Sequence, residues 1–69
     1  MPSIRLTLHA RLRIRELCSL AKAAFRAGHE GLAWAYRQAV LALRRGDETT
    51  AERWLEKADL ERYLLQASA

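Results

Sequence analysis

The sequence predicts an all-α protein, a small helical hairpin of two or three helices that forms a single domain over residues 1–69. Alanine and leucine dominate, and the one proline lies at position 2, so most of the chain favours helix. Three glycines divide the chain into segments of helical length. A chain this short buries only about 60% of the surface that its unfolded form exposes. We therefore also expect a homodimer, intertwined or side by side, to supply further stability.

The first nine residues are expected to form an arm before the helices. Apolar and polar side chains alternate from Ile4 to Arg15, which is typical of a half-buried strand. A helical pattern also fits from about residue 10 onward. Residues 3–8 could therefore form a short strand, an extended arm or the beginning of a helix.

The first helix is expected over residues 10–28 and has two distinct faces. The apolar face has side chains at three- and four-residue spacing: Ile14, Leu17, Cys18, Ala21, Ala24 and Phe25. The opposite face is basic and consists of Arg11, Arg15, Lys22 and Arg26. This basic face is either simply solvated or a contact surface for phosphates or carboxylates.

The second helix is expected over residues 31–45, and Gly46 ends it. Its buried face consists of Leu32, Tyr36, Ala39 and Leu43. The other face combines large apolar and polar side chains: Trp34, Arg37, Gln38, Leu41 and Arg45. Tryptophan among arginines is typical of an interface anchor. Packing against the other two helices would also explain this face.

The third helix is expected over residues 48–67. Asp47 can cap it, and Thr49 with Glu52 has the spacing of a capping box. One apolar face consists of Ala51, Trp54, Leu55, Ala58 and Leu65, while Leu60 and Leu64 lie roughly opposite. Because three short helices cannot cover two apolar faces on both later helices, this pattern also predicts dimerisation.

No residues form a recognisable catalytic or metal site. Cys18 is the only cysteine, so no disulfide can form within the chain, and its place on an apolar face indicates a small core residue. His9 and His29 have no serine, cysteine or carboxylate at useful spacing. We therefore expect no enzyme activity, no metal and no cofactor. No apolar run approaches the ~20 residues of a membrane span, and we expect a soluble cytoplasmic protein.

The net charge of +4 is distributed unevenly along the chain. Nine basic residues against two acidic ones precede Asp47, whereas six acidic residues against three basic ones follow from Asp47 onward. A basic first part and an acidic last part indicate nucleic acid, an acidic protein partner or pairing between copies.

Two binding functions fit these features. In the first, a protein partner docks on the second-helix face, with help from the first helix; the expected contacts are Trp34, Arg37, Gln38, Leu41, Arg45, Arg11 and Arg15. In the alternative, a strand followed by helices forms a ribbon-helix-helix repressor, whose paired strands enter the major groove of DNA. Arg5, Thr7 and His9 would then face the bases. A structural subunit without a regulatory role is a third possibility.

A basic, all-helical chain of this size without a catalytic constellation resembles the small early proteins of transposable phages that silence host regulators. The most similar in character are the quorum-sensing anti-activators and the related twitching-inhibitory proteins. The resemblance covers the whole chain in length and helical content, and it assigns no role to individual residues. It implies a helical homodimer that binds and disables a LuxR-type transcription activator. It also implies binding to the ATPase that powers type IV pilus assembly.

Overall fold

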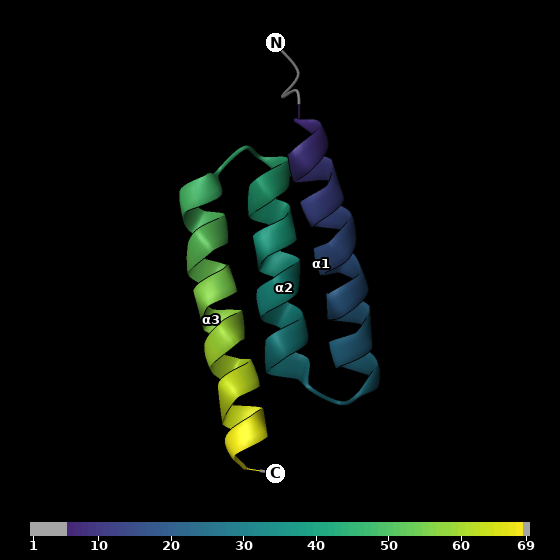
Figure 1. Cartoon of the computed structure of the whole chain (residues 1–69), viewed down its shortest axis with the longest axis vertical. Coiled ribbons are helices and arrows are strands. Elements are labelled where there is room, and N and C mark those ends of the chain that lie inside the picture. The colour runs from purple at the N-terminus through teal and green to yellow at the C-terminus, as the bar shows by residue number, and fades with distance from the viewer. Residues whose placement is uncertain (1–5, 69) are drawn as a thin grey trace.

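The computed structural model describes residues 6–68 as three α-helices joined by short turns. These are α1 (Leu8–Arg26), α2 (Glu30–Arg44) and α3 (Glu48–Ala67). Figure 1 shows them running antiparallel to their neighbours, with α2 between α1 and α3. Between residues 6 and 68 there is no strand. The predicted all-α fold is therefore confirmed, and each helix begins and ends within two residues of the expected position.

α1 begins at Leu8, earlier than expected, so residues 8 and 9 belong to the helix and not to an arm. Thr7 has extended backbone, and its hydroxyl oxygen accepts a hydrogen bond of 3.0 Å from the backbone N–H of Ala10. This bond caps the helix, and Leu8 and His9 already lie inside α1. A strand that includes Leu8 is therefore wrong, because the threonine cap and the helix-forming residues after it outweigh the alternating pattern. Residues 1–5 lie outside the described part of the chain.

Both turns between helices use the same backbone motif. After α1, the N–H of Gly28 donates to the carbonyl of Phe25 (3.0 Å), and the N–H of His29 donates to the carbonyl of Ala24 (2.9 Å). After α2, the N–H of Gly46 donates to the carbonyl of Leu43 (3.0 Å), and the N–H of Asp47 donates to the carbonyl of Ala42 (2.9 Å). The two glycines have positive φ values of 82° and 76°, which a residue with a Cβ atom rarely adopts. These glycines end the helices as the sequence predicted.

Asp47 caps α3, as predicted. Its carboxylate accepts hydrogen bonds from the hydroxyl (2.7 Å) and the backbone N–H (3.1 Å) of Thr50. These two bonds, with a smaller contribution from nearby arginines, hold the pKa of Asp47 below its ordinary value of 3.8. The capping box expected between Thr49 and Glu52 is wrong, because Gly46 ends α2 and leaves Asp47 as the capping residue.

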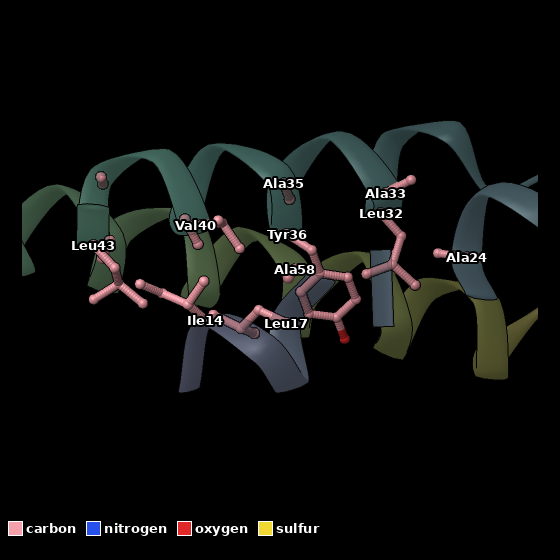
Figure 2. Packing of buried hydrophobic residues seen from close by; sticks show 13 residues of the cluster. Ile14, Leu17, Ala24, Leu32, Ala33, Ala35, Tyr36, Val40, Leu43 and Ala58 are labelled. Carbon is pink, nitrogen blue, oxygen red and sulfur yellow. The ribbon is translucent and has the colours of Figure 1, made fainter. Parts of the chain in front are cut away.

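The hydrophobic core is centred on α2. The buried apolar side chains of this helix are Leu32, Ala33, Ala35, Tyr36, Ala39, Val40, Ala42 and Leu43. α1 adds Ile14, Leu17 and Ala24, and α3 adds Ala51 and Ala58. In Figure 2, the ring of Tyr36 lies beside Leu17, below the α2 backbone. The predicted buried face of the second helix is therefore confirmed, whereas Trp54, Leu55 and Leu65 of the third helix are only half-buried.

α1 and α3 both pack on α2 but hardly contact each other. No Cα atom of α1 lies within 8 Å of a Cα atom of α3. The one ion pair in residues 6–68 joins the guanidinium of Arg13 on α1 to the carboxylate of Glu52 on α3 at 3.7 Å. The side chain of Arg13 is 37% exposed and that of Glu52 is 63% exposed, so solvent screens the pair and it contributes only about 0–1 kcal/mol. The structure therefore depends on two separate helix–helix contacts, each made with α2.

Candidate protein-interaction site

An open groove of about 450 Å³ lies between α1 and α2. It is lined by Cys18, Ala21, Lys22, Phe25 and Arg26 from α1 and by Ala33, Arg37, Val40, Leu41 and Arg44 from α2. The buried and half-buried lining residues, Cys18, Ala21, Ala33 and Val40, form its floor, and the exposed charged side chains lie along both edges. We refer to it as the α1–α2 groove. Grooves between helices that are apolar with charged edges are common binding sites for other proteins.

The charged edges of the α1–α2 groove carry only positive charge. Lys22 and Arg26 lie on the α1 edge, and Arg37 and Arg44 lie on the α2 edge. All four side chains are exposed, and none takes part in the one ion pair found within residues 6–68. The antiparallel packing of α1 and α2 therefore places two basic rows on either side of one apolar floor.

Phe25 belongs to the apolar face predicted for the first helix, but it is not buried with that face. It keeps 68% of its surface exposed and lines the α1–α2 groove. Phe25 lies in the last turn of α1, seven residues after half-buried Cys18, at the edge of the apolar stripe. The α2 residue in the same part of the groove is Ala33, whose methyl group is too short to cover a phenyl ring. An aromatic ring is therefore available at one end of the groove.

Trp34, Leu41 and Arg45 form an exposed line along the outer side of α2, which we call the α2 ridge. The three residues recur at spacings of seven and four, which places them on one helix face. Trp34 is 55% exposed and Leu41 is 37% exposed. Within the single chain, Trp34 is therefore not a core residue. Leu41 belongs to both surfaces, since it also lines the α1–α2 groove.

The structure brings together only part of the predicted contact set. Arg37 and Leu41 line the α1–α2 groove, and Trp34 and Arg45 lie beside it on the ridge. The half-buried Gln38 does not line the groove. Arg11 and Arg15 are exposed on the face of α1 that carries the basic groove edge, but nearer the N-terminus.

Among the charged and aromatic residues of the groove, four are absent from the predicted contact set: Lys22, Phe25, Arg26 and Arg44. Lys22 and Arg26 were visible as part of a basic face, and Arg37 and Arg44 share a seven-residue spacing on the next helix. The basic face of the first helix and the arginine spacing of the second indicate one common site when the two helices are paired antiparallel. For Phe25 the sequence carries no such signal.

Of the residues expected to read DNA, Thr7 and His9 do not lie in a strand. Thr7 caps α1, and His9 is an exposed residue of its first turn. Arg5 lies outside the described residues. The placement of Thr7 and His9 leaves no observation that favours a ribbon-helix-helix repressor.

A second exposed apolar surface lies on α3. Leu60 is 57% exposed, Tyr63 is 66% exposed and Leu64 is 52% exposed, and their spacing places them on one face. We call this surface the α3 outer patch. It confirms that α3 has a second apolar face, which a single chain leaves uncovered.

No family model, curated protein or solved structure matches this chain. None of the helices in residues 6–68 has the length and the apolar composition that a membrane span requires. In the same residues, no three histidine, cysteine, aspartate or glutamate side chains come close enough together to hold a metal ion.

Proposed function

We propose that this protein is a non-enzymatic, protein-binding inhibitor that docks on a regulatory protein through the α1–α2 groove and the α2 ridge. The observation that carries the proposal is the combination of two basic groove edges with two exposed aromatic rings, Phe25 in the groove and Trp34 on the ridge. Arginine and tryptophan are enriched among the few residues that contribute most of an interface's binding energy. An apolar floor beside them provides the area that excludes water from the contact.

The partners that we propose come from the resemblance to phage-encoded anti-activators. They are a LuxR-type transcription activator and the ATPase of type IV pilus assembly, both bound in the cytoplasm of the phage's host. A small protein acts on such targets in fixed stoichiometry, because it blocks a surface that the target needs for DNA, for assembly or for its own dimerisation.

We further propose that the protein acts as a homodimer. The α3 outer patch supports this, since three large side chains on one helix face are each more than half exposed in the single chain. A dimer that covers this patch would leave the α1–α2 groove and the α2 ridge available. Each dimer would then present two partner-binding surfaces.

Complex formation with each purified target tests the proposal. The protein is mixed with the activator or with the ATPase, and the mass of the complex is measured by size-exclusion chromatography with light scattering. Loss of promoter binding by the activator is the functional readout. We expect a complex with the wild type, a much weaker complex with Arg37→Ala, and an unchanged complex with Arg62→Ala, an exposed arginine on α3. Absence of any complex at tens of micromolar would contradict the proposal for that target.

A further inference from the structure

The length of the α1–α2 groove matches a short helical segment. Its α2 side extends from Ala33 to Arg44, which at 1.5 Å per residue is about 17 Å, or three helical turns. Its volume of about 450 Å³ holds a few apolar side chains rather than a whole helix. A bound helix would therefore lie over the groove and insert one apolar stripe into it, as in other helix-in-groove complexes.

The charges of the groove define the flanks of that helix. Lys22 and Arg26 on one edge and Arg37 and Arg44 on the other would lie along opposite sides of a segment seated between them. No carboxylate lines the groove, so the basic edges are not neutralised there. We propose that the α1–α2 groove binds an amphipathic helix of about three turns whose apolar stripe has aspartate or glutamate on both flanks. This inference rests on the proposed function and names the chemistry of the partner segment.

Nucleic acid fits the same groove less well. The floor consists of apolar side chains such as Ala21, Ala33 and Val40, which cannot donate hydrogen bonds to phosphates or base edges. A nucleic acid would contact the basic edges and leave this floor uncovered. An acidic amphipathic helix uses both parts of the groove.

A second copy of the chain also fits less well, because α3 carries mixed charge beside its outer patch. By helical spacing, Glu56 and Asp59 flank the patch on one side, and Arg53 and Lys57 flank it on the other. If this helix lay in the groove, its basic flank would face one of the basic edges. The α3 outer patch is therefore a poor ligand for the α1–α2 groove and remains available for the proposed dimer contact.

A synthetic peptide tests the inference without any partner protein. The probe has roughly 12 residues, with leucine at helical spacing and glutamate on both flanks. A scrambled peptide of the same composition and a peptide with lysine in place of glutamate serve as controls. Binding is measured by calorimetry at two salt concentrations. We expect only the amphipathic glutamate peptide to bind, with an affinity that falls as salt is raised.

Charge-reversed variants locate the site. Arg37→Glu and Arg44→Glu are expected to weaken binding of the glutamate peptide at least tenfold, since each replaces an attraction by a repulsion. Arg53→Glu, on α3, is the matched control and should bind like the wild type. Circular dichroism verifies that each variant remains helical. The exposure of all three arginines makes unfolding unexpected.

Several results would overturn the inference. They are equal binding of the scrambled peptide, equal loss of binding with Arg53→Glu, and preferential binding of a DNA duplex that Arg37→Glu abolishes. Self-association that occupies the groove and that the peptide cannot displace would also overturn it. If a complex with a regulatory protein forms while the glutamate peptide fails to bind, the proposed function stands and the acidic-helix inference is wrong.

Discussion

Trp34 and Tyr36 are two aromatic residues of the same helix in opposite environments, and replacing each with alanine separates stability from binding. Tyr36 is 4% exposed, whereas Trp34 is 55% exposed. Removal of a large buried aromatic side chain costs about 3–5 kcal/mol of unfolding free energy. Less than half of Trp34 is buried, so we expect Trp34→Ala to cost about 1–2 kcal/mol when the same range is scaled by burial.

These costs are large relative to the stability of so small a chain. At ~0.05–0.15 kcal/mol per residue, a chain of 69 residues has an unfolding free energy of about 3–10 kcal/mol. Tyr36→Ala should therefore leave the chain close to unfolded, while Trp34→Ala should lower its Tm by about 5–15 °C. Binding should respond in the opposite order, because truncation of a tryptophan anchor commonly costs ~2 kcal/mol, or roughly thirtyfold in affinity.

The assay combines thermal melting by circular dichroism with titration of the partner protein at a temperature where the variant is folded. If Trp34→Ala melts as early as Tyr36→Ala, the tryptophan contributes to the folded core, most directly across a dimer contact. If Trp34→Ala stays folded and binds like the wild type, the α2 ridge is not part of the docking surface. Either result would refute the role given to Trp34.

Three further predictions concern association, pH and the turns. Light scattering should give a mass near twice 7.9 kDa, and Leu60→Lys with Leu64→Lys should return it to the monomer value; a wild-type monomer at micromolar concentration would contradict the dimer. Because the folded-state pKa of Asp47 is below its ordinary value, the charged cap should stabilise the protein above about pH 4, and this stabilisation should be lost as the pH falls further. Asp47→Asn should lack this contribution to acid destabilisation. If the variant and the wild type lose stability identically with pH, the contribution of the Asp47 carboxylate is contradicted. Gly28→Ala should lower the free energy of unfolding, measured in urea, by about 1 kcal/mol, because Gly28 has a positive φ. Gly31→Ala is the control and should not lower it, since a Cβ has room there and φ is negative. Equal effects would show that the turn geometry is unimportant.

The sequence predicts the helices well because their ends depend on local chemistry. Gly28 and Gly46 each end a helix through backbone conformation, and Asp47 caps the next helix through bonds to a residue three positions away. The beginning of α1 was harder to predict, because two-residue and helical periodicities overlap up to Ile14. A single hydrogen bond from Ala10 to its capping residue marks the boundary there, and the alternating pattern gives no sign of it.

The candidate site could be predicted only in part, because it belongs to two helices at once. Arg37 and Leu41 were identified from one helix face alone. Their neighbours across the groove, Lys22 and Arg26, depend on the register of the antiparallel pair, which no single-helix pattern contains. The exposure of Phe25 likewise depends on which α2 residues line the same end of the groove, and the pattern of its own helix does not contain this information.

The central position of α2 also has a consequence for how long the binding surface exists. α1 is attached through its contact with α2 and through one weak ion pair to α3, so we expect local opening of α1 while the α2–α3 hairpin remains folded. Each such opening removes half of the α1–α2 groove. A bound segment would make this opening less frequent. On binding, amide hydrogen exchange should therefore show a larger increase in protection in α1 than in α3. The mobility of a single helix would then set the residence time of the partner.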